Sequence, residues 1–515
     1  MTDARAYHER TKHSPRSIRE SDFTLDEANR PRPDKHYLDV ERIDLPEADP
    51  TERPALVTIA QPAAQPTGDD TVGSVGLETL ASLCHESSGV VQRAHIRGEE
   101  VLFRAASCTG KLYHIDLYPV TGDVEGLPAG VYHFDPHEGT LDMLREGDYR
   151  GALADAVGTA STSGVEEAPV TFVATSTWWR NAWKYRERTY RHAFWDGGTV
   201  IANLLASAHG QGRRAEVVAG FEDGLVTRLL GLDPATEAPI ALVPIGSGDV
   251  VETRQTVDPI DYETAPLSSD PIAYPLIVDA WRQSQLVDAD AVDAWHEAAT
   301  AQRRIGRQQL EAGGDAVELS PVDGATASAR PLYATIERRG SKRTFAQEGP
   351  SRRQVGTVLD RALVGVPADW NGGEASGLTF NDVYLLATDV VGLDDARYVI
   401  HPDSAAATPI GPVDRATKTR LALQQDWAGE AHANVYLLTD VDAVVETLGN
   451  RGYRAAQLEA GVTLGRLYLA AFAHRPLGGT GLTFFDDHVT EALSPAAAGQ
   501  TPTCMFGFGR LPDER

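Results

Sequence analysis

Two stretches, LYHIDLYPV at residues 112–120 and LTFNDVYLL at residues 378–386, share one pattern and reveal an internal repeat. A shift of 266 residues places Leu112 on Leu378 and Tyr118 on Tyr384. Both stretches are rich in apolar, β-branched and aromatic residues, which favour strands. Self-similarity at so long a period indicates that the chain contains two copies of one domain.

The repeat extends into a second block, where a shift of 263 residues applies. APVTFVATS (168–176) and AHANVYLLT (431–439) predict interior strands. After each, apolar residues recur at i, i+3, i+4 and i+7, which predicts one long core helix per copy. These residues are Ile201, Leu204, Leu205 and Ala208, and then Leu464, Leu467, Tyr468 and Ala471. We therefore expect an α+β fold of two tandem domains, each a mixed sheet flanked by helices, forming a pseudo-dimer within one chain.

Domain boundaries follow from composition. Residues 1–70 are polar and, from residue 26, rich in Pro, Asp and Thr, which is typical of an N-terminal segment and an extended arm. The first domain is expected at residues 71–248 and the second at residues 331–512. Residues 249–330 form a linker between them, with a helix expected near residues 291–311.

Composition excludes several classes of protein. Of 515 residues, 42% are hydrophobic and 23% charged, which is typical of a globular chain. The formal net charge of −27 repels phosphate polymers and anionic lipids, so we expect no nucleic-acid or membrane partner. The few lysines among the 47 basic residues suggest a salt-loving host. The three cysteines form no CxxC pattern, so a cytoplasmic protein without a metal site is expected.

Several motifs resemble those of one superfamily. ERRGSKRTF (337–345) resembles the phosphate-binding RRSxR motif of FMN-dependent nitroreductases. RAASCTGKLYHIDLYPV (104–120), LPAGVYHFDP (127–136) and WKYRERTYRHAFWDGG (183–198) are similar to motifs of SagB-type dehydrogenases, which oxidise azoline and thiazoline rings in modified peptides. The resemblance covers nearly all of the chain outside the arm and linker. It implies a tandem nitroreductase-superfamily protein with FMN held between its two copies.

The residues that match the family motifs are divided between the copies. The second copy keeps the phosphate motif, as Arg338, Arg339, Ser341 and Arg343, whereas IAQPAAQP (59–66) in the first copy has no basic residue. The first copy keeps the loop that lies under the flavin ring, as Arg104, Ser107, Thr109 and Gly110. The second copy has Trp370, Gly373, Ala375 and Ser376 there. The resemblance further implies flavin contacts from Glu459, Gly461 and Arg510, so we expect one composite flavin site per chain.

The catalytic expectation concerns two adjacent residues of the first copy. Lys184 and Tyr185 match the Lys-Tyr pair of azoline dehydrogenases, while the second copy has Thr447 and Leu448. The resemblance implies a base and a proton donor beside the flavin during oxidation of a small or peptide-borne ring. The alternatives are an NAD(P)H-dependent nitro or quinone reductase and a non-catalytic scaffold of a peptide-modification complex. The substrate, the electron acceptor and any further oligomerisation stay open.

Three other features favour structural roles. Cys108 has no evident His or Asp partner in the sequence, which favours a small buried residue. His133 lies beside an Asp-Pro pair, which predicts a surface turn. The arginines that recur in both copies are expected to pack the start of each long helix: Arg188, Arg191, Arg451 and Arg454.

Overall fold

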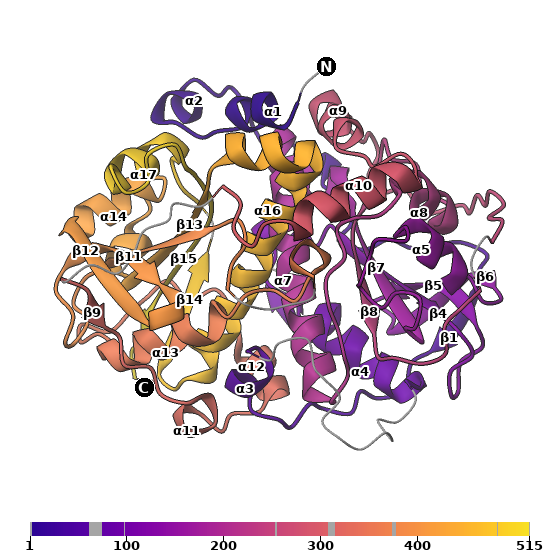
Figure 1. Ribbon diagram of the computed structural model, residues 1–515, viewed down its shortest axis with the longest axis horizontal. Coiled ribbons are helices and arrows are strands. Elements are labelled where there is room, and N and C mark those ends of the chain that lie inside the picture. Colours follow the sequence, from indigo (N-terminus) through magenta and orange to yellow (C-terminus); the bar gives the residue numbers. More distant parts are fainter. Residues whose placement is uncertain are drawn as a thin grey trace.

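The computed structural model describes residues 3–60, 75–96, 98–252, 255–306, 315–372, 377–481 and 483–513. These residues form two lobes, and two long helices, α7 (Thr189–Gly210) and α16 (Val441–Ala473), pack against each other between them (Figure 1). The first copy builds one lobe and the second copy builds the other. The expected α+β fold with an internal pseudo-dimer is confirmed.

Each lobe contains one large sheet. The first has the strand order β1-β6-β5-β4-β7-β8 and the second β14-β15-β13-β10-β11-β12-β9. The ladders between these strands are antiparallel throughout the described residues, which corrects the expectation of mixed sheets. The strands of the first sheet are β1 (Glu41–Asp44), β4 (Ile115–Thr121), β5 (Gly130–Asp135), β6 (Thr140–Glu146), β7 (Val170–Thr177) and β8 (Glu237–Ile245). Those of the second are β9 (Val317–Glu318), β10 (Asp382–Ala387), β11 (Ala396–His401), β12 (Ala406–Pro412), β13 (Ala433–Thr439), β14 (Leu477–Gly481) and β15 (Thr501–Arg510).

The repeated stretches occupy equivalent central positions. Strands β4 and β10 contain the two stretches that revealed the repeat, and each pairs with the predicted interior strand that follows, β7 or β13. All four strands are buried along their length. The other helices are α1 (Ala4–Arg10), α2 (Pro15–Arg19), α3 (Ala55–Thr58), α4 (Leu77–Ser88), α5 (Arg150–Ala156), α6 (Trp178–Tyr185), α8 (Asp223–Leu230), α9 (Pro275–Gln283), α10 (Ala289–Thr300), α11 (Gly324–Ala327), α12 (Leu332–Arg338), α13 (Arg352–Ala362), α14 (Arg415–Leu421), α15 (Asp426–Glu430) and α17 (Asp486–Leu493).

The two long helices cross at a pair of equivalent glycines. A Cβ atom on Gly198 would lie 2.3 Å from the carbonyl carbon of Gly461, and one on Gly461 would lie 2.3 Å from the carbonyl oxygen of Phe194. Glycine is therefore required at both positions, because any side chain would force the backbones apart. This contact corrects the expectation that Gly461 touches a flavin.

A buried ion cluster joins the first copy to the second. Arg188 and Arg191 at the start of α7 bind Asp486 of the second copy at 3.2 and 2.6 Å. Although burial disfavours the charged carboxylate, the two guanidinium groups hold the pKa of Asp486 well below its usual range. Helix α1 covers the cluster, since Arg191 also donates to the carbonyl of His8 at 2.7 Å.

An equivalent cluster lies across the pseudo-twofold axis. Arg451 and Arg454 of α16 bind Asp223 of the first copy at 2.6 and 2.7 Å. Here α9 takes the place of α1, since Arg454 donates to the carbonyl of Trp281 at 2.8 Å. The recurring arginines therefore have the structural role that the sequence favoured, and each pair finds its carboxylate in the opposite copy.

The arm belongs to the first lobe rather than lying outside it. Strand β1 is too short and too polar to show a period, yet it pairs with β6 at the sheet edge. The Nζ atom of Lys35 donates to Glu237 at 2.9 Å and to Tyr118 at 3.0 Å, which ties the arm to the sheet core. In the linker, the expected helix begins at Ala289 but ends at Thr300 rather than near residue 311.

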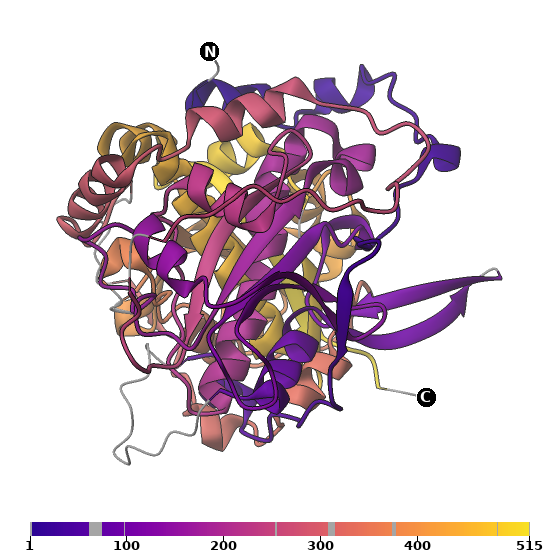
Figure 2. The same cartoon turned by 90° about the vertical axis from the view of Figure 1, so that its right-hand side faces the viewer.

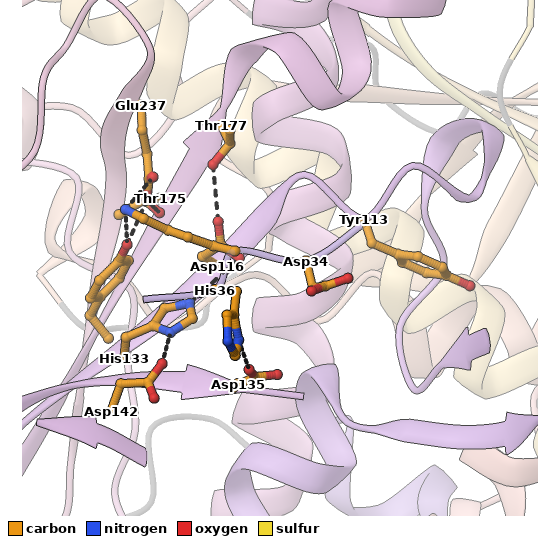
Figure 3. Close-up of polar contacts among 12 residues, drawn as sticks. Asp34, His36, Tyr113, Asp116, His133, Asp135, Asp142, Thr175, Thr177 and Glu237 are labelled. Atoms are coloured by element: carbon orange, nitrogen blue, oxygen red, sulfur yellow. Dashed lines mark hydrogen bonds and ion pairs between the residues drawn. The ribbon is translucent and has the colours of Figure 1, made fainter. Parts of the chain in front are cut away.

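His133 is buried, which corrects its assignment to a surface turn. It lies in β5 between the carboxylates of Asp116 and Asp142, at 3.8 and 3.0 Å (Figure 3). Although burial disfavours the charged ring, both carboxylates raise the pKa of His133 above its usual value. Asp135 is the last residue of the strand, so the turn begins at Pro136, three residues after the histidine.

The ion clusters predict a difference between two adjacent carboxylates. Asp486→Asn should lower the free energy of unfolding by about 3 kcal/mol or more, because it leaves two buried arginines without a counter-charge. Asp487→Asn is the matched control, since the Asp487 carboxylate is largely exposed and pairs with Lys12 at 2.9 Å, and it should cost under about 1 kcal/mol. Urea unfolding measures both. Equal losses would contradict the role given to the cluster.

Candidate functional site

The candidate site is a cavity of about 1560 Å³ that both copies line. The first copy contributes the loop at residues 106–111 and the end of α6, with Lys184 and Tyr185. The second copy contributes the segment at residues 337–344, which begins at the end of α12 and carries the phosphate motif. The two half-motifs predicted from the sequence therefore open into one space.

Arg339 links the two half-motifs directly. Its guanidinium donates to the backbone carbonyls of Arg104 and Ala105 at 2.9 Å each, and to that of Ala106 at 3.2 Å. These carbonyls immediately precede Ser107, which lines the cavity. Arg339 thus holds the loop of the first copy against the second copy, with three hydrogen bonds from its Nε and Nη2 atoms.

The rest of the phosphate motif divides into anchoring and exposed residues. Arg338 donates to the carbonyls of Phe472 and Leu477 at 2.7 and 3.0 Å, so it anchors the end of α16. Ser341 and Arg343 are exposed and line the cavity. A hydroxyl and a guanidinium on one short segment suit a phosphate group, because both donate hydrogen bonds to anionic oxygens.

Asp196 shapes the loop of the first copy. Its carboxylate accepts from the backbone N–H of Thr109 at 3.0 Å and from the Thr109 hydroxyl at 2.8 Å. Within the loop, Gly110 and Lys111 have φ values of 67° and 59°. A non-glycine residue in this left-handed region costs about 1 kcal/mol, and such strain is common at functional sites. The carboxylate of Asp196 therefore stabilises a turn that the backbone alone disfavours.

Asp196 also binds Cys108 and His114, which corrects the assignment of Cys108 as a residue without partners. The Cys108 thiol donates to Asp196 at 3.3 Å, and His114 Nε2 lies 2.9 Å from the same oxygen. Burial and the neighbouring carboxylate raise the pKa of Cys108 well above its usual value, so the thiol is protonated and a poor nucleophile. These three residues have donor atoms suited to a metal, but hydrogen bonds already account for their arrangement.

The proposed catalytic pair lies on the wall formed by the first copy. Lys184 is exposed, and its Nζ atom lies 5.5 Å from the centre of the Tyr185 ring. Burial and the carboxylate of Asp196 raise the pKa of Tyr185, so its phenol is protonated at neutral pH and can donate a proton. The charge of Arg343 from the second copy acts on the same phenol in the opposite direction. Arg343 of the phosphate motif is therefore close enough to Tyr185 for its charge to affect the pKa of the phenol.

Two predicted flavin contacts do not line the cavity. Arg104 is buried beneath the loop, where it donates to the carbonyl of Pro33 at 2.8 Å and lies 4.9 Å from the centre of the Tyr113 ring. Arg510 forms an ion pair with Glu348 at 3.2 Å. Both residues hold segments around the site rather than facing it, which corrects their assignment as cofactor ligands.

Glu459 also has a structural contact in place of the predicted flavin contact. Its carboxylate accepts from the backbone N–H groups of Thr379, Phe380 and Asn381 at 2.5, 2.9 and 3.1 Å. Glu459 is therefore the counterpart of Asp196, because each carboxylate on a long helix holds the chain that leads into the central strand of its own lobe. The sequence revealed the pairing of these two residues but not their shared role.

Several aromatic and histidine side chains line the cavity although the sequence did not predict them as site residues. Trp195 and Phe484 line it with ring centroids 6.0 Å apart, one from each copy. His192 lies 4.6 Å from Tyr185, and His13 reaches the cavity from the N-terminal segment. Aromatic rings of this kind suit a flat conjugated ligand. His192 is seven residues from Tyr185 and lies on the next helix, α7, so no periodic pattern in the sequence pointed to their contact.

Among the residues that the structure describes, direct contacts close the pseudo-equivalent position on the opposite side of the helix pair. Val217 donates to the carbonyl of Pro367 at 2.9 Å and accepts from the N–H of Asp369 at 3.0 Å, so two segments pair directly there. The Asp369 carboxylate then accepts from the N–H groups of Ala219 and Gly220 at 2.9 and 2.7 Å. Gly220 corresponds to Thr483, which lines the open cavity.

Linker helix α10 completes this closure. Its His296 Nε2 lies 3.1 Å from the Asp369 carboxylate, and a Cβ atom on Gly220 would lie 2.4 Å from the same nitrogen. Trp370, predicted as an altered loop residue, is fully buried nearby. The stretch at residues 61–66 of the first copy, and Gly373, Ala375 and Ser376, lie outside the described residues. Together these contacts fill the position equivalent to the cavity.

Comparison with known proteins agrees with this geometry. Residues 131–247 match the model of the nitroreductase family. This stretch, which lies in the first lobe, is similar to a nitroreductase-family domain. The structure of a protein from Anabaena variabilis named as a nitroreductase aligns over 99% of this chain and 100% of its own length, with a TM-score of 0.72 and 24% identity. The nitroreductase fold therefore extends over both lobes.

Two curated relatives match parts of the nitroreductase-like chain. A protein of Methanocaldococcus jannaschii named as a nitroreductase is 24% identical over 168 residues, which is 33% of this chain and 80% of that protein. The trifolitoxin-processing protein TfxB of Rhizobium leguminosarum bv. trifolii is 29% identical over 145 residues, which is 28% of this chain and 39% of TfxB. The match thus spans well under half of TfxB. Within the described residues, the helices include none with the length and apolar character needed to cross a bilayer.

The closed position predicts a pH-dependent stability. Burial and the nearby Asp369 raise the pKa of Glu216 to about 7, although Arg214 at 2.7 Å opposes them. Between the unfolded pKa of about 4.3 and pH 7 the folded state binds more protons, so this group destabilises the fold increasingly as pH rises. Glu216→Gln should therefore raise the free energy of unfolding at pH 8, by on the order of 2 kcal/mol, and change it little at pH 4.5. Denaturant unfolding at both values measures this, and an equal effect at the two pH values would contradict it.

Proposed function

We propose that the protein is an FMN-dependent oxidoreductase of the SagB type, which oxidises an azoline-like ring or a related small substrate. The observation that carries this proposal is the cavity to which the second copy contributes Ser341 and Arg343 and the first copy contributes Ser107 and the Lys184-Tyr185 pair. The nitroreductase-family domain supports an oxidoreductase. The name of TfxB, a trifolitoxin-processing protein, supports a role in peptide modification.

The lining of the cavity fits FMN in two respects. Ser341 and Arg343 would hold the phosphate, and the rings of Trp195 and Phe484 offer surfaces for the isoalloxazine. The loop that Asp196 and Arg339 fix would lie beside the ring system. When bound there, FMN supplies a two-electron acceptor for a hydride.

The chain's own groups would then handle the protons. Oxidation of an azoline removes a proton as well as a hydride, so a base must face the ring carbon. The amine of Lys184 is exposed to the cavity and, in its deprotonated form, would take that proton. The phenol of Tyr185 is held protonated and can hydrogen-bond to the heteroatom of the ring. His192, against the edge of Tyr185, orients the phenol.

One flavin per chain is part of the proposal. The position equivalent to the cavity is filled by the pairing of Val217 with Pro367 and Asp369, and by His296 of α10. It also lacks counterparts of Lys184 and Tyr185, because Thr447 and Leu448 stand there. A second flavin would have to displace a buried hydrogen-bonded segment.

The decisive experiment is the absorption spectrum of purified protein reconstituted with FMN, with the stoichiometry measured by titration. The proposal expects flavin absorption at one equivalent per chain. A protein that stays colourless would favour the non-catalytic scaffold instead. Reduction of quinones or nitroaromatics with NAD(P)H, without oxidation of azoline-containing peptides, would favour the general reductase.

The phosphate contact is tested by comparing two flavins. Arg343→Gln should weaken FMN binding by about tenfold to a hundredfold, because a charge-assisted hydrogen bond is lost, and leave riboflavin binding unchanged. Arg353→Gln is the control, since Arg353 is exposed on α13 away from the cavity. Flavin fluorescence measures both affinities. If Arg343→Gln weakens both flavins equally, the phosphate does not lie at this segment.

The catalytic pair is tested separately from binding. Lys184→Ala should retain FMN but lower the turnover number for azoline oxidation by about a hundredfold or more, because general-base catalysis contributes factors of this size. Tyr185→Phe should retain FMN and have a smaller effect on turnover, because it removes a hydrogen-bond donor but leaves the base in place. Stopped-flow flavin reduction measures the chemical step. Unchanged rates in Lys184→Ala would remove the role proposed for this amine.

A further inference from the structure

The lysines of this chain are distributed unevenly. The chain has only six among 47 basic residues. Lys12 pairs with Glu9 and Asp487, and Lys35 pairs with Glu237. Lys418 is buried and donates to Thr388 and to the carbonyl of Ala431. The other three all line the cavity: Lys111, Lys184 and Lys342.

The cavity is positive although the chain is strongly negative. Two acidic side chains line it, Glu337 and Asp513, against eight basic ones. Arg188, Arg338 and Arg339 are among the eight but bind groups of the fold itself. The remaining five are exposed. Lys184 is the proposed base, and within the described residues no ion pair joins the other four to a carboxylate: Lys111, Lys342, Arg343 and Arg475. In a chain of net charge −27, such a concentration of unpaired cations costs stability by self-repulsion unless an anion neutralises it.

One flavin phosphate accounts for only part of this charge and space. A phosphate monoester carries at most two negative charges, so it neutralises at most two of these cations. The cavity of about 1560 Å³ also exceeds the roughly 300–1,000 Å³ typical of a pocket for one small ligand. A second occupant therefore has room beside the flavin and should itself be anionic.

The unpaired cations lie on three separate elements around the cavity. Lys111 follows β3 (Glu99–Arg104) and lies 4.5 Å from the Phe103 ring, Lys342 follows α12, and Arg475 follows α16. Strand β3 pairs with β2 (Val90–Ile96) in a ribbon that projects from the body of the molecule, and residues at its base line the cavity (Figure 2). Cations that come from three separate segments suit carboxylates distributed along a chain better than one compact diphosphate.

We infer that the second occupant is an acidic peptide, whose carboxylates meet Lys111 and Arg475 while its reacting ring reaches Lys184. This inference rests on the proposed function, and it names the class of substrate. Because the cations are exposed, the attraction acts mainly on encounter and is screened by salt, with a Debye length of about 8 Å at physiological ionic strength. Peptide affinity should therefore fall as salt rises, even in a protein whose remaining surface repels acidic chains.

The test uses the FMN-reconstituted full chain and two fluorescein-labelled peptides, one rich in glutamate and one with glutamine in each of those places. Fluorescence anisotropy at low salt should show tighter binding of the glutamate peptide. Lys111→Gln and Arg475→Gln should each weaken its binding by about fivefold and flatten its salt dependence, since an exposed charge pair contributes up to about 1 kcal/mol. Arg353→Gln, which removes one exposed positive charge outside the cavity, should have no effect.

The outcomes separate this inference from the proposed function. Equal affinity for the two peptides, or an equal effect of Arg353→Gln, would overturn the acidic-peptide inference while flavin absorption still supported the oxidoreductase. Displacement of the glutamate peptide by NADPH, together with saturable reduction of the flavin by NADPH, would overturn it in favour of a dinucleotide. Salt-dependent peptide binding by a protein that takes up no flavin would support the inference and overturn the proposed function.

Discussion

The reciprocal exchange of charges between the two copies is the interaction on which the rest of the structure depends. Each pair of helix arginines finds its carboxylate in the opposite copy, Asp486 for one pair and Asp223 for the other. An unpaired guanidinium in an apolar interior is costly, so neither lobe can bury its own arginines without the other. The crossing of Gly198 and Gly461 brings the backbones close enough for these contacts. The cavity lies beside this interface and is formed by it.

The two copies form equivalent frameworks on the two sides of the helix pair, but one side holds an open cavity and the other is closed. Asp196 and Glu459 hold equivalent loops in the same way, and the ion clusters are equivalent, so the framework is symmetric. The residues that occupy the two sides are not equivalent. On one side Ser341 and Arg343 face the loop of the first copy across open space, and on the other Asp369 binds backbone N–H groups directly. Asymmetry arises from a few residues placed on a symmetric frame.

The sequence predicted the features that depend on local patterns of residues. It did not predict contacts between residues that lie far apart in the chain. Period and composition located the strands, the long helices and the repeat, and the half-motifs led to the cavity. The roles of Gly461 and Glu459 were wrong because a motif match does not say what a residue touches, and here each touches backbone. The closure by His296 could not be predicted, since the linker resembles neither copy. Likewise, Cys108 and Asp196 are 88 positions apart, and only the fold joins them.

The closure of one side by α10 has a consequence for how such a protein can evolve. In a dimer of identical subunits every substitution occurs twice, so a residue that improves one site also alters its twin. Here α10 belongs to a segment that exists once per molecule, and it packs against one side only. A substitution of Lys184 or Lys111 likewise occurs once per molecule. In a single chain each surface can therefore change without altering the other.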